Sequence, residues 1–367
     1  MKLIGKTELD QITIGASILA AGGGGDPYIG NVMARNAIDQ YGPIKLISVD
    51  ELDEDDLIVS TGMIGAPTVM IEKIPNGLES VRACEKMAKF LGRPITAVYP
   101  IEAGGMNSLL PMATAAALGV PIVDVDGMGR AFPEFQMTTF HLDGVTGSPF
   151  IIVDDKFNSG LIEANDAVWT ERIARSVCAR MGGAAIFAAY PISPAVARKS
   201  GITGILSFEQ TIGETVQKAQ QAGHNPVDAL VTLLKAHRLF SGKVVEVDRR
   251  TEGGWSSGVA RLEGLGEHRG KRFDVSFQNE FLLAKCEGRP LCMTPDLISL
   301  LDEDTGLPIL AERLRYGARV VALGVPANDK WRTKKGIEVA GPRYFKYDMD
   351  YISVEVLNQT HPYGGVN

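Results

Sequence analysis

The pattern of apolar residues changes near residue 243, and this change limits the folds open to this chain of 367 residues. Before it, short apolar runs rich in β-branched residues alternate with longer stretches of helical periodicity. Such alternation predicts a three-layer α/β domain in which helices cover a mostly parallel sheet. After it, strand-like pieces are separated by glycine, proline and charged turns. This second pattern predicts an all-β domain, either a β-sandwich or a barrel-like sheet.

The expected elements indicate two domains. The length of the chain indicates the same, because it exceeds the length that usually folds around one hydrophobic core. Buried strands are expected at residues 45–49, 57–61, 95–99, 121–125 and 184–192. Helices are expected at residues 8–21, capped by Thr7, and at 77–91, 107–118, 166–181 and 226–237, with a weaker helical pattern at 308–316. We therefore place an N-terminal α/β domain at 1–165, a helical and β connecting region at 166–242, a β-rich domain at 243–358 and a flexible tail at 359–367.

The composition argues against several classes of protein. The chain has 37 basic and 44 acidic residues, a net charge of -7, and no basic stripe, so binding to nucleic acid or to an anionic membrane is not expected. The apolar stretch near the N-terminus is too short to cross a bilayer. Four cysteines in so long a chain make no disulfide framework, and Cys286 and Cys292 are expected to be free thiols. A cytoplasmic protein is expected.

A run of four glycines in AAGGGGDPYIG, residues 20–30, invites a phosphate-binding interpretation. It lacks the Gly-Lys of a Walker loop, and it follows an expected helix, whereas a dinucleotide fingerprint follows a strand. Asp26 is instead a good N-cap and Pro27 suits the first position of a second helix, so the run is expected to be an elbow between two helices. The bare backbone at Gly24 and Gly25, with Asp26, is a candidate binding place for a carboxylate or ring oxygen; a plain tight turn is the alternative.

Polar side chains follow the strand expected at residues 95–99. In ITAVYPIEAGGMNSLLP, this strand runs into a glycine-containing turn and then a helix, so Glu102, Gly104 and Asn107 fall at the carboxyl end of the strand. Ligands bind at this edge in open α/β sheets. Glu102 is therefore a catalytic candidate, and Gly104 and Asn107 are candidates for binding substrate.

Two aspartates end the strand expected at residues 121–125. Asp124 and Asp126 are two residues apart, which in a strand places both on one face, roughly 6 to 7 Å apart. Such a pair can act as acid and base or bind a cation, with Arg130 as counter-ion or substrate clamp. The alternative is that Asp126 makes a turn and that Arg130 pairs with Glu134 at the surface.

The five histidines give no metal signature, because none stands in an HxH or HExxH spacing and no Cys-x-x-Cys is present. A divalent metal such as zinc is therefore neither required nor excluded. Asp124, Asp126 and His141 are the candidate ligands. In GAPTVMIEKIP, Glu72 and Lys73 are neighbours in an expected extended run and are predicted to point to opposite faces.

The strand-like segment RFDVSFQNEFLLA carries two more candidates, Asn279 for binding substrate and Glu280 for catalysis. Alternation places the two on opposite faces, and one of those faces is expected to be buried. An unpaired buried polar group costs roughly 2 to 7 kcal/mol, so a ligand or the other domain is expected to pair with it. A row of polar side chains facing solvent is the alternative.

Six stretches together resemble one protein family: GGGGDPY (22–28), GAPTVMIEKIP (65–75), EAGGMNSLLP (102–111), DVDGMGRAFPEFQM (124–137), FQNEFL (277–282) and GPRYFKYD (341–348). Over nearly its whole length the chain is similar to a bacterial family first described as a domain of unknown function and later as S-methyl thiohydantoin desulfurase-like proteins, which are associated with hydantoinases and oxoprolinases. The resemblance implies an N-terminal α/β domain, a C-terminal β domain, and hydrolysis at an amidine-like carbon of a five-membered ring with release of a thiol.

This chemistry needs activated water, stabilisation of a tetrahedral intermediate and a proton for the leaving group. From position, Asp124 or Asp126 is expected to be the base or metal ligand and Glu102 or Glu280 the acid, with Arg130 and Asn107 orienting the substrate. The expected ligand is a small polar ring compound such as a hydantoin. A second interpretation is a non-catalytic subunit or ligand-sensing module that acts with a hydantoinase or oxoprolinase. A homo-oligomer is compatible with either.

Overall fold

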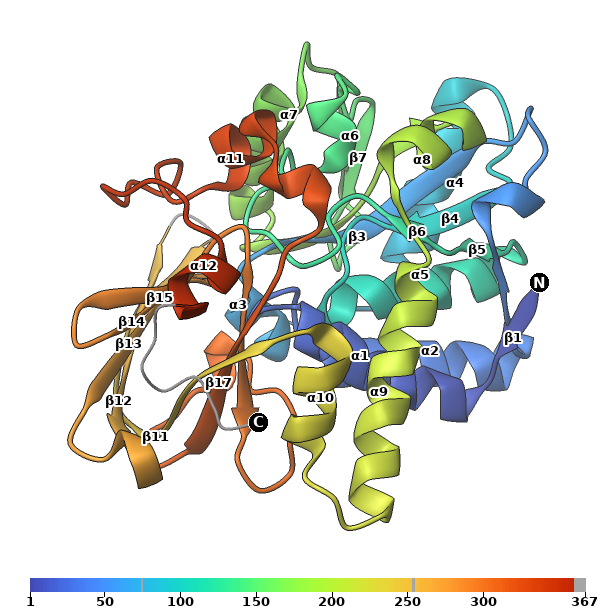
Figure 1. Ribbon diagram of the computed structural model, residues 1–367. Coiled ribbons are helices and arrows are strands. Elements are labelled where there is room, and N and C mark those ends of the chain that lie inside the picture. Colours follow the sequence, from blue (N-terminus) through green and yellow to red (C-terminus); the bar gives the residue numbers. More distant parts are fainter. Residues whose placement is uncertain (74, 253–254, 360–367) are drawn as a thin grey trace.

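The protein has two domains of mixed α/β structure, each built on its own sheet (Figure 1). The computed structural model describes residues 1–73, 75–252 and 255–359. The larger hydrophobic core lies around the first sheet, and a second core lies under the second sheet. Among the helices of the described residues, none combines the length and apolar character that crossing a bilayer requires. Apart from its first residue, the tail expected at 359–367 lies outside the described residues.

The first sheet has eight strands, in the order β1-β2-β5-β4-β3-β9-β7-β8. Their bounds are β1 (Lys2–Ile4), β2 (Ile44–Ile47), β3 (Ile58–Gly65), β4 (Ala97–Pro100), β5 (Ile122–Val123), β7 (Phe150–Val153), β8 (Ser159–Ile162) and β9 (Ala184–Ile192). Only β2, β5, β4 and β3 pair in parallel, so the expectation of a mostly parallel sheet is wrong. The sheet is mixed because β9 pairs antiparallel with both β3 and β7.

Helices cover this sheet and form a layer at the base of the molecule in Figure 1. The long helices are α1 (Lys6–Leu19), α2 (Pro27–Tyr41), α4 (Glu79–Leu91), α5 (Gly105–Leu118), α7 (Ala167–Arg180), α9 (Ile205–Gln221) and α10 (Pro226–Leu234). Helix α9 was not expected from the sequence, and it packs closely along α1. A Cβ on Gly213 would overlap the backbone of Gln11, so glycine permits this close approach.

Three local expectations in the N-terminal domain are wrong. Helix α1 begins after Gly5, so Thr7 lies inside the helix and is not its cap. The stretch expected to be extended at residues 65–75 contains the short helix α3 (Pro67–Glu72), so Glu72 and Lys73 are not strand neighbours. Lys73 instead forms an ion pair with Asp155 at 2.7 Å. Further short elements are α6 (Thr139–Leu142), α8 (Pro194–Ser200) and a two-stranded pairing of β6 (Val125–Asp126) with β10 (Ile202–Thr203).

The second sheet is a single antiparallel half-barrel of seven strands, in the order β15-β14-β13-β12-β11-β17-β16. Its strands are β11 (His237–Glu252), β12 (Trp255–Gly264), β13 (Arg272–Gln278), β14 (Glu280–Cys286), β15 (Arg289–Met293), β16 (Leu297–Asp302) and β17 (Arg319–Val325). The barrel-like expectation therefore holds and the sandwich does not. The part beyond residue 243 also contains the helices α11 (Lys334–Ala340) and α12 (Val354–Gln359), whereas the helical pattern at 308–316 forms only a 3-10 turn, Ala311–Arg313.

Candidate functional site

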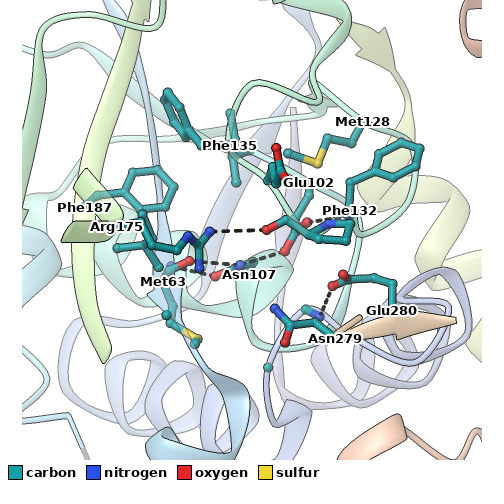
Figure 2. Close-up of a pocket in the computed structure, with 17 residues that line it drawn as sticks. Met63, Glu102, Asn107, Met128, Phe132, Phe135, Arg175, Phe187, Asn279 and Glu280 are labelled. Carbon is teal, nitrogen blue, oxygen red and sulfur yellow. Dashed lines mark hydrogen bonds between the residues drawn. The ribbon is translucent and has the colours of Figure 1, made fainter. Parts of the chain in front are cut away.

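Residues from both domains line one cavity where the domains meet (Figure 2). It contains about 500 Å³ of space that no atom fills, including its opening to solvent. The lining comes from the glycine loop between α1 and α2, the ends of β3 and β4, the segment after β6, helix α7, strand β9 and the junction of β13 and β14. Six of the twelve site residues expected from the sequence line it: Gly24, Gly25, Glu102, Asn107, Asn279 and Glu280.

Glu102 lies in the turn between β4 and α5 and is held by two donors. The amide nitrogen of Asn107 donates to one carboxylate oxygen at 2.7 Å, and the backbone N–H of Phe132 donates to the other at 3.1 Å. Asn107 is itself fixed, because its side-chain oxygen accepts the backbone N–H of Met63 at 2.7 Å. Burial raises the pKa of Glu102 to about 7, against the lowering effects of its donors and of Arg130. A carboxyl with this pKa can exchange a proton near neutral pH.

Glu280 begins β14 and reaches the cavity from the second domain. One of its carboxyl oxygens accepts the backbone N–H of Gly24 at 3.3 Å, and the other has no hydrogen-bond partner among the described residues. Burial, and then the nearby Glu102, raise the pKa of Glu280 well above its usual range. Glu280 has one hydrogen-bond donor in the described residues where Glu102 has two, so fewer hydrogen bonds stabilise the ionised form of Glu280. The two carboxyls of this cavity therefore have different surroundings. Such a difference suits separate roles as acid and base.

Asn279 sits beside Glu280 in a left-handed backbone conformation, with φ of 59°. Its backbone N–H donates to the carbonyl of Ser256 at 2.7 Å, and its side-chain oxygen accepts the backbone N–H of Ser256 at 2.9 Å. This local pairing supports a conformation that asparagine tolerates better than most residues. Asn279 forms the turn between β13 and β14, and this turn places Glu280, the first residue of β14, at the cavity.

Arg130 is buried, with 1% of its surface exposed, so the surface pair with Glu134 does not form. Its Nη1 donates to the carbonyls of Pro295 and Asp296 at 2.7 and 3.0 Å, and its guanidinium lies 4.4 Å from the ring centroid of Phe132. Burial lowers the pKa of Arg130 to about 10, although nearby acidic groups, first Glu280, act in the opposite direction. The residue remains a cation behind the two carboxyls and joins the two domains.

The glycine run is an elbow between α1 and α2, as expected. Asp26 caps α2 by accepting the N–H of Tyr28 at 2.8 Å, and it also pairs with Arg313 of the second domain. The Asp26 carboxylate is thus occupied by structural contacts and does not line the cavity. Gly24 has φ of 73°, and a Cβ there would lie 2.7 Å from the carbonyl group of Gly104. A Cβ on Gly104 would lie 2.8 Å from the Cβ of Ala131, and Gly104 is not among the residues that line the cavity.

Asp124 and Asp126 do not face the cavity, which corrects the expectation of a catalytic pair. Asp124 accepts the N–H of Leu206 at 2.7 Å and the hydroxyl of Ser207 at 2.5 Å, so it caps the start of α9. Asp126 accepts the N–H groups of Met128 and Gly129 at 3.0 and 2.6 Å and holds a turn. The two side chains diverge because β5 ends before Asp124 and a separate strand, β6, contains Asp126.

Burial raises the pKa of Asp126 to about 8, and one of its carboxyl oxygens has no hydrogen-bond partner within the described part of the chain. The turn interpretation of Asp126 is therefore correct. The nearby Glu102 carboxyl raises the pKa of Asp126 further.

The proposed metal ligands are not brought together. His141 lies in α6, half-buried, and its charged neighbours are Asp166 and Lys335; burial lowers its pKa. Across residues 1–73, 75–252 and 255–359, no three His, Cys, Asp or Glu side chains form a group that could hold a metal ion. All four cysteines are free, including Cys286 and Cys292.

Several lining residues were not singled out from the sequence, among them Met63, Phe135, Arg175 and Phe187. Phe187 and Arg175 reach the cavity because β9 and α7 pack beside β3, and this pairing was not expected. Met63 reaches it because β3 continues to Gly65, four residues beyond its expected end. An apolar run that extends into GAP at residues 65–67 was the one signal for this longer strand.

The comparisons with known proteins agree with this architecture. A crystal structure of a protein from Chromobacterium violaceum has a TM-score of 0.79 and 22% sequence identity, and the match covers 96% of this chain and 100% of that chain. This likeness shows a shared fold. No curated protein matches the chain. The family model "S-Me-THD-like, N-terminal domain" matches residues 7–164, and "S-Me-THD-like, C-terminal domain" matches residues 165–354. The chain therefore belongs to the S-Me-THD-like family, the family that its six sequence stretches resemble.

Proposed function

We propose that the protein is a hydrolase that acts on a hydantoin-like ring, converting an S-methyl thiohydantoin and water to a hydantoin and methanethiol. The family assignment supports the substrate class. One observation carries the reaction type: Glu102 and Glu280 are both buried and line one cavity, and Glu102 accepts two hydrogen bonds where Glu280 accepts one. Paired carboxyls of this kind serve as general base and general acid.

In this proposal Glu102 is the base. Its carboxylate takes a proton from water as the water oxygen bonds to C2 of the ring, and the C2=N π electrons move to the ring nitrogen. Asn107 and the N–H of Phe132 hold the carboxylate while this occurs. Because the pKa of Glu102 is raised to about 7, it is a stronger base than an exposed glutamate and is still ionised in a useful fraction near neutral pH.

Glu280 is the acid. Its proton goes to the ring nitrogen as negative charge develops there. The tetrahedral intermediate then collapses, with C2=O formed, the C2–S bond broken and the proton gained by Glu102 transferred to sulfur, so that methanethiol leaves. The ring nitrogen keeps its new proton as an N–H of the hydantoin, and the hydroxyl proton released as C2=O forms returns to Glu280 and restores the acid. Arg130, a buried cation near both carboxyls, offsets the negative charge of the ionised site.

The proposed mechanism uses no metal ion, because the described residues of this cavity do not form a group of metal ligands. The roles of Asp124, Asp126 and His141 as metal ligands therefore find no geometric support. Metal analysis of the purified protein, with activity measured before and after chelation, tests this part of the proposal independently. Activity that is lost on chelation and restored by zinc or manganese would require a different mechanism.

The decisive experiment measures thiol release from an S-methyl thiohydantoin with Glu102→Gln and Glu280→Gln. Each amide keeps the shape of the side chain but cannot exchange the proton, and kcat is expected to fall by roughly 10²- to 10⁴-fold. Glu267→Gln, an exposed glutamate in the second domain, is the matched control and should keep wild-type kinetics. Binding of the ring compound without turnover in the wild type would instead support a non-catalytic, ligand-sensing subunit.

A further inference from the structure

A buried glutamate that does not line the cavity, Glu209, has no role in the mechanism described so far. It lies in the second turn of α9, and none of its surface is exposed. One of its carboxyl oxygens accepts the hydroxyl of Ser108 in α5 at 2.7 Å, and the other has no hydrogen-bond partner among the described residues. Burying a carboxyl costs free energy, so its presence here indicates a role that an apolar side chain could not fill.

The Ser108 hydroxyl connects Glu209 to the turn that carries Glu102. Its oxygen accepts the backbone N–H of Gly104 at 2.9 Å while it donates to Glu209. A serine within a helix commonly donates to the carbonyl four residues before it, which for Ser108 is the carbonyl of Gly104. Here that carbonyl accepts the N–H of Asn107 at 3.0 Å instead. Glu209 therefore holds the hydroxyl in the orientation in which a lone pair faces the Gly104 N–H.

The hydrogen bond to Gly104 reaches two residues of the site. Gly104 is the N-cap of α5, two residues after Glu102 and three before Asn107. The side-chain amide of Asn107 donates to the Glu102 carboxylate at 2.7 Å, so this hydrogen bond spans the turn that Gly104 shapes. A Cβ on Gly104 would lie 3.1 Å from the Cα of Ala20, so the turn is also closely packed. The position of Gly104 therefore decides whether the Asn107 donor and the carboxylate meet.

The backbone of Glu209 is fixed from two directions. A Cβ on Gly15 would lie 1.9 Å from the carbonyl oxygen of Glu209, so α1 and α9 touch at this residue. The start of α9, three residues earlier, is capped by Asp124. An acceptor on so firmly held an element is suited to fixing a site residue through an intermediate hydrogen bond.

The surroundings of Glu209 favour its neutral form. Burial raises its pKa well above the usual range, and Asp126 and Asp124 act in the same direction, against the lowering effect of Ser108. The carbonyl oxygen of a neutral carboxyl accepts a hydroxyl as the oxygen of an amide does. Glutamine is therefore expected to replace Glu209 in this role, whereas alanine is not.

We propose that Glu209 is a positioning residue for the hydrolase reaction: through Ser108 it fixes Gly104 and so keeps Asn107 bonded to Glu102. This inference rests on the proposed function and adds a residue outside the cavity to it. If Glu209 loses its acceptor, the turn shifts and Glu102 loses a hydrogen bond that lowers its pKa, so this pKa must rise.

Three other charged groups surround Glu102 and stay in place when Glu209 is substituted. Arg130 lowers the pKa of Glu102, and Glu280 and Asp126 are the carboxyls whose own pKa values Glu102 raises. A change in the titration of Glu102 therefore reports on its hydrogen bonds.

NMR titration of the Glu102 carboxyl measures this change without any need for turnover. In protein labelled with ¹³C at the glutamate Cδ, the Glu102 signal is assigned by its loss in Glu102→Gln. Glu209→Ala is expected to move its titration midpoint to higher pH by about one pH unit and to lower kcat/KM for thiol release at pH 7 by roughly fivefold, since a smaller fraction of the base is ionised. Glu209→Gln is expected to keep both close to wild type. Glu214→Ala, on the same helix with a side chain 43% exposed, is the matched control and should also match wild type.

An unchanged midpoint in folded Glu209→Ala would overturn the inference, even if that variant is less stable, because Glu209 would then be a structural residue alone. An equal shift in Glu209→Gln would overturn it too, because the charge or proton of Glu209 would then act on the base. If Glu209→Ala does not fold, Ser108→Ala takes its place: a shift to higher pH supports the inference and an unchanged midpoint overturns it.

Failure of the proposed function gives a separate result. If wild-type protein releases no methanethiol, the hydrolase proposal fails, while the NMR titrations still show whether Glu209 holds Asn107 against Glu102. If thiol is released and the midpoints do not move, the hydrolase stands and the positioning role of Glu209 falls.

Discussion

Glu102 illustrates how one side chain acquires its chemistry from its surroundings. Its sequence position, after a strand and before a helix, is shared by many acidic residues of α/β proteins, and position alone gives no pKa. Burial between the domains raises the pKa to about 7, and the Asn107 and Phe132 donors keep it from rising further. A carboxyl in water would be almost fully ionised at this pH and a weaker base.

The first residue-scale prediction concerns pH. If the Glu102 carboxylate is the base, kcat/KM should rise with pH and reach half its plateau near pH 7, the value to which burial raises this pKa. Below pH 6 the rate should fall about tenfold per pH unit, since only the ionised fraction reacts. The pH–rate profile of thiol release measures this. A rising limb centred near pH 4.5, where an exposed glutamate titrates, would remove Glu102 from the role of base.

The same pKa makes a prediction for stability. The folded state binds the Glu102 proton more tightly than the unfolded state, so more protons are bound in the folded state between pH 4.5 and about 7. The free energy of unfolding must then decrease as pH rises through this window, and the part due to Glu102 is fully present only below pH 4.5. Asp126, with a pKa raised from 3.8 to about 8, contributes with the same sign.

Denaturant unfolding at pH 5 and pH 8 measures this dependence. Glu102→Gln should lose less stability than the wild type between the two pH values, since the amide does not titrate. Glu267→Gln, whose carboxyl is largely exposed, should behave like the wild type. A wild type whose stability rises over this range would show that Glu102 is not buried as described.

The sequence predicted the role of a single residue correctly where that residue contacts its neighbours in the chain. Asp26 caps the helix that starts one residue later, and a cap needs no knowledge of the rest of the fold. It did not work for Asp124, whose partners are Leu206 and Ser207, about 80 positions away. Their pairing depends on where α9 begins, and no local pattern near Asp124 contains that information.

At the scale of elements, the strands and helices with strong apolar patterns were correctly expected. The segment at 184–192 is β9 with the expected bounds, and α4, α5 and α7 differ from expectation by a few residues. What could not be predicted was strand direction. Whether β9 runs parallel or antiparallel to β3 depends on the path of the connecting chain, and this placement brings Phe187 to the cavity. The place of Phe187 at the cavity was therefore beyond sequence reasoning.

Substitutions of Asp124 distinguish its two possible roles, as the cap of helix α9 and as a catalytic residue. As the cap of α9, Asp124→Ala should destabilise the protein by about 1 to 2 kcal/mol with little change in kcat, because two backbone N–H groups and a hydroxyl lose their acceptor. Asp124→Asn should restore most of this stability, since asparagine caps helices about as well as aspartate. Thr215→Ala, a change at a half-buried residue further along the same helix, is the control for substitution within α9.

Denaturant midpoints and thiol release, measured on the same samples, distinguish a helix-capping Asp124 from a catalytic one. A catalytic Asp124 would show the reverse pattern, in which Asp124→Asn retains stability but loses turnover. That outcome would return Asp124 to the site and would require a rearrangement of the start of α9 during the reaction.

At the scale of the whole molecule, the elbow at residues 20–25 lies between the two domains and is bonded to both. The carbonyl of Ala21 accepts the N–H of Phe281 at 2.7 Å, and the carbonyl of Gly22 accepts the N–H of Ala311 at 2.8 Å. Gly24 donates to Glu280. The glycines thus allow a bare backbone to pair with the second domain, and Gly24 and Gly25 also line the cavity.

Arg130 is the buried cation at this domain junction and gives the last prediction. It joins the segment after β6 to the carbonyls of Pro295 and Asp296, close to Trp331, whose indole N–H donates to the Met128 carbonyl at 2.7 Å. Arg130→Met should keep much of the volume but remove the donors and the charge that offsets Glu280. Losing one partner of buried charges and hydrogen bonds costs about 3 to 5 kcal/mol.

Because this junction belongs to both domains, the lost stability should appear in a single transition rather than in one domain alone. Urea unfolding followed by tryptophan fluorescence and by circular dichroism checks this, since coincident curves indicate a cooperative transition. Arg343→Met is the matched control: Arg343 is exposed and pairs with Asp348 and Asp350 at the surface, so the loss should stay within about 1 kcal/mol. Separate transitions in the Arg130 variant would mean that each domain is stable without the junction, and the cavity between them would then depend on domain docking as well as on its own side chains.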